Sequence, residues 1–168
     1  MPKNTVGELI VQTPIVTQGY FKDPLQTAQS FRDGWFLTGD LVSQDEDGYY
    51  YFVSRKKDII RRRGENISGA EIDRIVGEHP SVAEVAAIAV PAELGEDEIL
   101  VVIVLKPEQI ISPKDIGLWC SARLSAMKIP RYVVFTSALP YTPTNKISKA
   151  LLRANTTLIK QATDLQNH

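Results

Sequence analysis

The sequence has 168 residues, of which 43% are hydrophobic and 23% charged, so it can form one ordinary domain or one small domain with part of another. Its formal net charge of −1 gives no overall reason to expect nucleic acid or an anionic membrane as a partner. The lone Cys120 excludes an internal disulfide framework and a zinc site built from cysteines, and no stretch is long enough to span a membrane, so we expect a soluble, cytoplasmic chain.

The first part of the chain, residues 7–53, is expected to be rich in β-structure. The segment GELIVQTPIV carries several β-branched residues, and glycine and proline recur after it at a spacing typical of loops. Asp47 and Gly48 form a turn signal directly before the aromatic run from Tyr49 to Phe52, which predicts a β-hairpin.

A charged run, residues 54–58, follows this hairpin and precedes a second extended stretch through Ile59 and Ile60. Such a run is usually a solvated surface, but it can also be a hinge, because a hinge must stay exposed through large changes of backbone angle. We take the run as the boundary between two structural units, residues 1–54 and residues 55–168.

The second unit combines helical and β-rich patterns. SGAEIDRIVGEHP begins with Ser68 and has Glu71 three residues later, which is a capping box at the start of a helix. Two β-rich runs, VAEVAAIAVP and EILVVIVLKP, precede the helical stretch PKDIGLWCSARLSAM, the short strand YVVFT and a terminal helix over ISKALLRANTTLIKQA. This order predicts an α+β fold in which a compact β-sheet is covered by helices, preceded by the β-rich first unit.

Asp40 is the first residue that suggests chemistry. It follows Gly39 at the end of an aromatic-rich stretch, where a carboxylate can accept two hydrogen bonds from a vicinal diol. The plainer interpretation is an aspartate in a tight turn that satisfies backbone N–H groups.

Three consecutive arginines before a glycine form a second candidate. Arg61, Arg62 and Arg63 can place a basic strand beside a backbone that approaches a ligand closely at Gly64. In an extended strand Arg61 and Arg63 face one side and Arg62 the other. The alternative is a basic edge strand that discourages aggregation and ends in a glycine turn.

The segment LPYTPTNKISK contains a third candidate, Lys146. Pro140 and Pro143 favour an extended, stiff loop from which the lysine projects before the next helix. A lysine on such a loop can deliver a point positive charge to a phosphate or to a developing oxyanion. An ordinary solvent-exposed lysine is the alternative for this position viewed alone.

Read in order, these segments resemble the C-terminal half of the adenylate-forming superfamily, which includes acyl-CoA synthetases, aryl-CoA ligases, luciferases and peptide-synthetase adenylation domains. The match extends from residue 7 to residue 153 through GELIV, FRDGWFLTGDL, DGYYYFVSRKKDIIRRRGENIS, KIPRYVVF and LPYTPTNKISKALLR. The resemblance implies an acid–CoA ligase that uses ATP and Mg²⁺ to make an acyl-adenylate, which CoA then converts to a thioester. Within the ligases, RRRGENIS is similar to the bacterial branch that includes carnitine/crotonobetaine–CoA ligase-like enzymes.

The resemblance also implies roles for individual residues. Asp40 would hold the ribose hydroxyls of ATP, Arg55 would contact the nucleotide, and Lys57 would be the hinge. Lys146 would bridge the attacking carboxylate and the α-phosphate during adenylation. The tunnel for the pantetheine arm of CoA would be lined by Gly64, Glu65 and Asn66.

Two positions depart from the family pattern. Arg63 stands where the family often has the first glycine of Gly-Gly-Glu-Asn, and Asn145 replaces the glycine before Lys146. Asn is the mildest replacement if that backbone position has a positive φ. The sequence does not rank the basic side chains that could reach CoA phosphates, which are Arg61, Arg62, Arg63, Arg123 and Lys128.

The family's phosphate loop, acyl pocket and magnesium-binding glutamate lie in a large N-terminal domain. Residues 1–54 resemble the tail of that domain and residues 55–168 the small domain, so we expect a fragment that is inactive alone, holds no metal and has the large domain as its partner. Two alternatives stay open: an adenylation domain that delivers to a carrier protein, and a non-enzymatic lid or interaction module acting in trans. The acid substrate and the oligomeric state, a homo-oligomer included, stay open as well.

Overall fold

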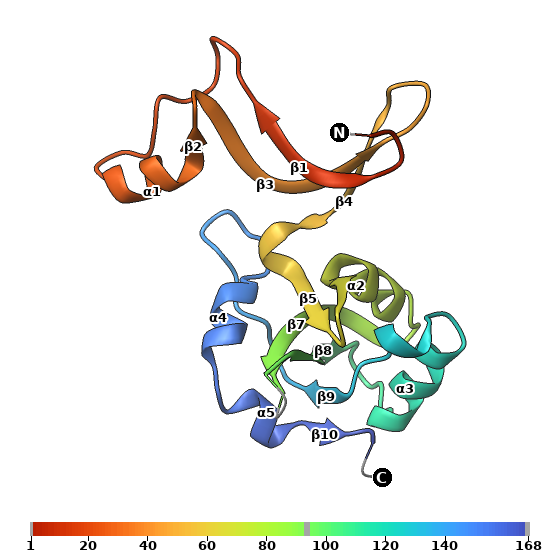
Figure 1. Cartoon of the computed structure of the whole chain (residues 1–168). Helices are drawn as coiled ribbons and strands as arrows, with labels where there is room; N and C mark the ends of the chain where they lie inside the picture. The colour runs from red at the N-terminus through yellow and green to blue at the C-terminus, as the bar shows by residue number, and fades with distance from the viewer. Residues whose placement is uncertain (1, 93–94, 167–168) are drawn as a thin grey trace. The chain divides into compact units, whose positions relative to one another are not determined.

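The computed structural model describes residues 2–92 and 95–166 (Figure 1). The chain forms two compact units, Met1–Lys57 and Asp58–His168. The division falls inside the charged run of residues 54–58, after Lys57.

The first unit is built around one long strand, β3, which pairs antiparallel with three others. The predicted hairpin is present between β3 and β4: Gln44 lies opposite Tyr50, and the N–H of Gly48 donates to the carbonyl of Asp45 over 3.2 Å. The elements of this unit are β1 (Val6–Val11), α1 (Pro24–Ser30), β2 (Phe31–Arg32), β3 (Trp35–Gln44) and β4 (Tyr50–Arg55).

The first unit is rich in β-structure, as expected, and it also contains one short helix, α1, that was not predicted from the sequence. Pro24, which the sequence pattern marks as loop punctuation, stands at the first helical position, where its fixed φ suits the helix and its missing N–H has no partner to lose. Asp23 caps the helix, because its carboxylate accepts a hydrogen bond of 2.9 Å from the N–H of Gln26.

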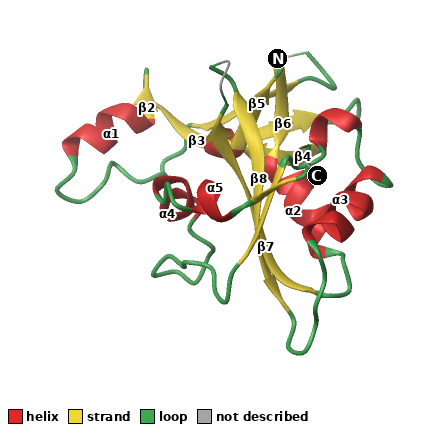
Figure 2. Cartoon of the chain, turned by 90° about the horizontal axis from the view of Figure 1, so that it is seen from below, coloured by secondary structure: helices red, strands yellow, loops and turns green. Residues whose placement is uncertain are grey.

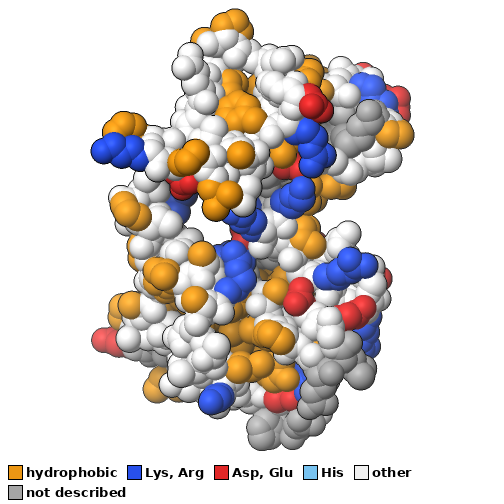
Figure 3. Space-filling model, turned by 60° about the vertical axis from the view of Figure 1, so that its left-hand side comes forward, with side chains coloured by type: hydrophobic (Ala, Val, Ile, Leu, Met, Phe, Trp, Pro, Cys, Tyr) orange, Lys and Arg blue, Asp and Glu red, His pale blue; other side chains and the backbone are white. Residues whose placement is uncertain are grey.

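The first unit has almost no apolar core of its own. Among its described residues, Val42 is the one hydrophobic side chain that is buried. The aromatic run on and beside β4, from Tyr49 to Phe52, is between 55% and 68% exposed. Hydrophobic side chains lie uncovered on this unit (Figure 3). Because burial of apolar surface is the main driving force of folding, this sheet has little to stabilise it by itself.

We therefore expect the two units to differ strongly in local stability. In amide hydrogen exchange of the isolated chain, the amides of β3 and β4 should exchange close to the rate of an unfolded peptide. Amides of the second unit's central strands should be protected by several orders of magnitude more. Equal protection in both units would contradict this view of the first unit.

The second unit confirms the predicted α+β fold. Strands β7 and β8 pair antiparallel, β9 joins β8 in parallel, and β10 joins β9 antiparallel. A separate hairpin, β5–β6, comes directly after the charged run. The division between the units falls within η1 (Lys56–Asp58). The other elements of the second unit are β5 (Ile59–Arg62), β6 (Glu65–Ser68), α2 (Gly69–Gly77), β7 (Val82–Pro91), β8 (Asp97–Leu105), α3 (Pro113–Ser121), η2 (Ala126–Lys128), β9 (Tyr132–Phe135), α4 (Lys149–Ala154), α5 (Leu158–Gln161) and β10 (Thr163–Asp164).

Helices cover both faces of this sheet (Figure 2). On one face α2 and α3 pack Ile72 and Ile116 against alternate residues of β8 such as Val101. On the other face α4 and α5 pack around Val102 and Leu152. The side chains of β8 therefore alternate between two cores, as the period of a strand requires. The predicted helix start at Ser68 is present, since its hydroxyl accepts from the N–H of Glu71.

The single terminal helix predicted over ISKALLRANTTLIKQA was wrong. The segment forms α4 and α5, which are separated at Asn155, and ends in strand β10. The Asn155 side chain accepts hydrogen bonds from the N–H and the hydroxyl of Thr157, and this local bonding competes with continuation of the helix. No helix within residues 2–92 and 95–166 is long and apolar enough to cross a membrane.

Cys120 is buried in the core between α3 and the sheet, as expected for a structural thiol. Burial raises the pKa of this thiol to about 11 because the thiolate is poorly solvated there. We expect no reaction with a thiol-specific reagent in the folded protein at about pH 8, and complete reaction in guanidinium. The absorbance of the released thiolate measures both, and rapid labelling of the folded chain would contradict the buried position.

Candidate active site

Asp40 and Arg55 are brought together in the first unit. Asp40 lies on β3 directly opposite Arg55 on β4, and its Oδ1 is 2.6 Å from the Arg55 Nε. Arg55 of this pair lines a polar hollow in the same unit. Beside it the Glu8 carboxylate accepts from the Gly39 N–H over 3.2 Å and pairs with the Lys56 ammonium over 2.8 Å. Each of the two carboxylates is thus held beside a cation, and Glu8 also lines the hollow.

Lys57 lies at the end of the first unit. It belongs to a single short turn of 3₁₀ helix, Lys56–Asp58, and its side chain is exposed. The division between the compact units follows directly after it. A short irregular segment between two units can absorb a change of backbone angles with few contacts to break.

The Gly64 segment is a tight hairpin turn in the second unit. Arg62 lies opposite Glu65, so Arg63 and Gly64 are the two turn residues, with φ of 48° and 80°. Positive φ at both positions is the pattern of the type I′ turn. A Cβ placed on Gly64 would meet nothing within 4 Å, so the space beside this glycine is open. Glu65 and Asn66 follow on β6 and are exposed.

Arg62 cannot serve as a free phosphate contact, although its sequence left that role open. It is only 4% exposed, and its Nη1 donates to the carbonyls of Met127 (3.0 Å) and Ile129 (2.9 Å). Its Nε lies 2.8 Å from the carboxylate of Glu98, which is also buried. Arg62 therefore points into the unit and fixes the hairpin, opposite to the exposed Arg61, as the alternation of a strand predicts. Arg63 lies beyond the end of β5, in the turn.

Of the other basic candidates, two have partners within the unit and two have no ion-pair partner among the described residues. Lys128 pairs with both oxygens of Glu71, at 2.7 and 2.9 Å. Arg123 stacks on Trp119 at 3.4 Å from the ring centroid. The side chains of Arg61 and Arg63 are exposed, and within the described part of the chain neither has an ion-pair partner. Of the set, these two are available to a phosphate.

The loop that carries Lys146 is closed by its own hydrogen bonds. The N–H of Thr142 donates to the Lys146 carbonyl over 2.8 Å, and the Thr142 hydroxyl accepts from the Lys146 N–H over 3.2 Å. Asn145 has a φ of 58°, so the position before the lysine does need the left-handed backbone that asparagine tolerates. The Lys146 side chain is exposed, and no residue described in the structure forms a hydrogen bond or ion pair with its ammonium.

The base of this loop is attached to the sheet. Tyr141 forms a β-bridge with Ile147, and the Ser148 N–H donates to the Pro140 carbonyl over 2.8 Å. The Tyr141 hydroxyl also donates to the carboxylate of Glu84 on β7, and this bond raises the pKa of the tyrosine. The loop is therefore stiff for reasons beyond its two prolines.

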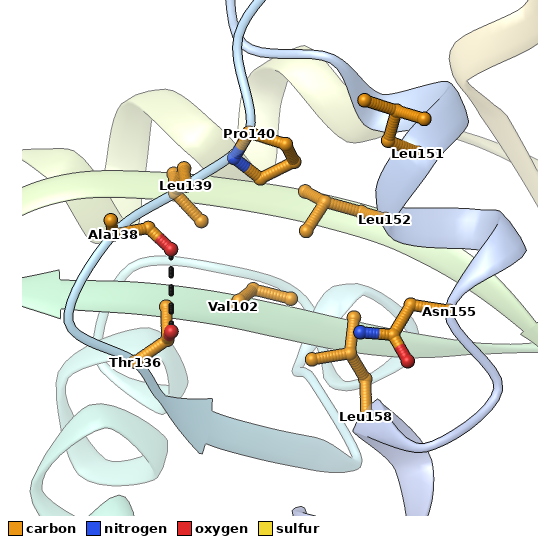
Figure 4. A pocket seen from close by; sticks show the side chains of 9 residues that line it. All are labelled: Val102, Thr136, Ala138, Leu139, Pro140, Leu151, Leu152, Asn155 and Leu158. Carbon is orange, nitrogen blue, oxygen red and sulfur yellow. Dashed lines mark hydrogen bonds between the residues drawn. The ribbon is translucent and has the colours of Figure 1, made fainter.

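An apolar hollow lies beside this loop (Figure 4). Leu139 and Pro140 line it from the loop, and Leu151, Leu152 and Leu158 line it from α4 and α5. No charged side chain lines this hollow, so we assign it no part in the chemistry.

Residues 71–146 match the family model of the AMP-binding enzyme C-terminal domain. The chain contains an AMP-binding enzyme C-terminal domain. It is 41% identical over 152 residues to the putative acyl-CoA synthetase YngI of Bacillus subtilis, covering 89% of the chain and 28% of that protein. It is 39% identical over 147 residues to the long-chain-fatty-acid–CoA ligase FadD13 of Mycobacterium tuberculosis, covering 88% and 29%.

Solved structures of adenylate-forming enzymes have the same fold. The o-succinylbenzoate CoA synthetase MenE of Bacillus subtilis, in complex with its acyl-adenylate intermediate, superposes with a TM-score of 0.83 at 29% identity over 97% of this chain and 32% of its own. ATP-bound MatB of Rhodopseudomonas palustris gives 0.82 at 32% identity over 92% and 31%. The chain thus spans less than a third of the length of these relatives. The carnitine-ligase branch suggested by RRRGENIS finds no support among these proteins.

The residues that support the Lys146 loop were not identified from the sequence. Tyr141 and its partner Glu84 are 57 positions apart, and Lys149 and its partner Asp73 are 76 positions apart. Only the packing of α2 and β7 beside the loop brings these groups together. The one usable signal was the occurrence of charged residues inside otherwise apolar segments.

Arg63 has a φ of 48°, a backbone conformation that favours glycine over residues with a side chain. We expect Arg63→Gly to raise the free energy of unfolding of the second unit by about 0.5–1 kcal/mol, measured by guanidinium unfolding. Arg61→Gly is the matched control: it removes the same side chain from a regular strand, and it should lower the stability. If both substitutions lower it equally, the turn holds no strain at Arg63.

Proposed function

We propose that this chain is the C-terminal portion of an ATP-dependent acid–CoA ligase, which makes an acyl-adenylate and then an acyl-CoA thioester. The observation that carries the proposal is the combination of an unpaired, exposed Lys146 on a stiff loop and an open Gly64 turn in one compact unit, of which residues 71–146 match the AMP-binding enzyme C-terminal domain. The named relatives, which include several CoA ligases, support the same reaction class.

In the first half-reaction we assign Lys146 to adenylation. A carboxylate must attack an α-phosphate, so two anions have to meet, and a positioned ammonium lowers their repulsion and stabilises the charge that develops. An ammonium already paired with a carboxylate could not do this without first breaking that pair. The exposed, unpaired side chain of Lys146 meets the requirement.

Asp40 and Arg55 are our candidates for nucleotide binding. We assign the ribose hydroxyls to the Asp40 carboxylate, whose side chain is 26% exposed and which pairs with Arg55, a residue that lines the polar hollow. Arg55 is more exposed than its partner, so it can turn toward a phosphate when ATP is bound.

In the second half-reaction we assign the binding of CoA to the Gly64 hairpin. We assign Gly64, with Glu65 and Asn66, to the passage for the pantetheine arm of CoA, because the space beside the glycine is open. Arg61 and Arg63 are then the side chains for the CoA phosphates. Lys57 is the hinge about which the second unit turns between the two steps.

The remaining parts of the reaction are assigned outside this chain. Mg²⁺ would accompany ATP, but the described residues contain no group of three His, Cys, Asp or Glu side chains that could hold a metal. The acid pocket and the cover for the aromatic run of the first unit would be supplied by a large preceding domain. Delivery to a carrier protein is the second candidate function, and the ligase names among the relatives favour CoA instead.

The test separates the two half-reactions in the ligase of which we propose this chain to be a part. Lys146→Ala should lower pyrophosphate exchange driven by the acid by at least about a hundredfold, while thioester formation from supplied acyl-adenylate is retained. Gly64→Leu is the matched reverse: it should leave exchange intact and block thioester formation. Equal loss of both steps in either variant would contradict the assigned roles.

A further inference from the structure

Helix α4 carries a buried cation that the reaction does not use. Lys149 is the first residue of α4 and stands three residues after Lys146. Its side chain is only 14% exposed, and its Nζ lies 2.5 Å from the Oδ2 of Asp73 on α2. The other oxygen of Asp73 accepts from the N–H of Ala87 on β7 over 2.6 Å. One oxygen of this carboxylate thus joins α2 to α4, and the other joins α2 to β7.

A second ion pair joins the same helix to the start of the unit. Arg153, one turn further along α4, places its Nη1 3.1 Å from the Oδ1 of Asp58. Asp58 is the first residue of the second unit and follows the proposed hinge, Lys57, directly. Helix α4 is thus bonded to the end of the unit that leads into the hinge.

The chain is closely packed at Gly69, beside these two ion pairs. A Cβ placed on Gly69, the first residue of α2, would lie 2.9 Å from the Asp58 carbonyl oxygen and 3.4 Å from the Lys149 Nζ. The hinge end, the start of α2 and the start of α4 therefore meet at Gly69. Burial also raises the pKa of Asp73 despite the attraction of Lys149, which marks this position as poorly solvated.

We propose that Lys149 and Arg153 are positioning residues for adenylation: they fix α4, and with it the Lys146 loop, at a set distance from the hinge. This inference rests on the proposed roles of Lys146 and Lys57. A rotation about a hinge delivers a distant side chain accurately only if the connection between the two is stiff. The ion pairs to Asp58 and Asp73 supply that stiffness through residues next to both ends.

If this connection is loosened, we expect the rate of adenylation to fall. A displacement of about 1 Å at a reacting group can reduce the rate by about a hundredfold. Thioester formation uses the Gly64 turn, at the end of the β5–β6 hairpin away from Asp58. The buried Arg62 fixes that end through Glu98, Met127 and Ile129, so this step should be affected little. A split between the two half-reactions is therefore the signature of a positioning role, whereas a general loss of structure lowers both.

The experiment uses the complete ligase with Lys149→Met and Arg153→Met. Each should reduce the kcat of pyrophosphate exchange by about ten- to a hundredfold with little change in the KM for ATP, and keep thioester formation from supplied adenylate within about threefold. Arg153→Lys retains the charge and should recover most of the exchange rate. Arg74→Met is the matched control, because it removes an ion pair with Glu78 on exposed α2 positions that does not involve α4.

Arg153 is more exposed than Lys149, so Arg153→Met carries the test if Lys149→Met fails to fold. Loss of both half-reactions together, or no loss in either, would overturn the inference. Lys146→Ala in the same protein distinguishes failure of the positioning role from failure of the proposed function. If it loses adenylation while the α4 variants do not, only the positioning role fails; if it keeps adenylation, the proposed function fails as well.

Discussion

Strand β8 is buried on both faces, and each candidate element of the second unit is attached to the framework that this strand supports. Residues such as Val101 pack against α2 and α3, while neighbours such as Val102 pack against α4 and α5. A strand that serves two cores tolerates little displacement on either side, since interiors are close-packed. The Lys146 loop and the Gly64 hairpin therefore project from one stiff body.

The two elements are attached to that body by different means. The hairpin is fixed by the buried Arg62, which reaches Glu98 on β8 and two backbone carbonyls. The Lys146 loop is fixed by Tyr141 on one side and by Lys149 on the other. Because the attachments are separate, a substitution at one element can displace that element without the other. The proposed division of two chemical steps between the elements depends on this separation.

The first unit has the opposite character. It offers Asp40 and Arg55 on a sheet whose aromatic side chains are exposed, with a single buried hydrophobic residue in its described part. A sheet of this kind needs apolar surface from elsewhere to become stable. The chain spans less than a third of the length of the relatives that it matches, so a further domain could supply that apolar surface. For the same reason we place the acid pocket outside this chain.

The sequence predicted the fold class and the hairpin at Asp47 and Gly48, because both depend on local periodicity and turn chemistry. It did not predict helix α1, where Pro24 can equally begin a helix or interrupt a strand, nor the break at Asn155, which depends on a side-chain bond to Thr157. The assigned site residues came from spaced motifs and stay predictions.

The inward orientation of Arg62 and the supports of the Lys146 loop could not be found from sequence. Arg62 and its carbonyl partner on Met127 are 65 positions apart, and local rules do not reach partners at such separations. The alternation of a strand does separate Arg61 from Arg62, but it does not say which of the two faces the core.

The proposed role of Lys146 can be tested by a crystal structure of the complete ligase with its acid and an ATP analogue that cannot be cleaved at the α-phosphate. We expect the Lys146 ammonium within about 3 Å of an α-phosphate oxygen, with the contacts of Tyr141 to Glu84 and of Lys149 to Asp73 retained. This role would be contradicted by a Lys146 that stays in solvent while another cation, such as Arg61 or Arg63, occupies that position.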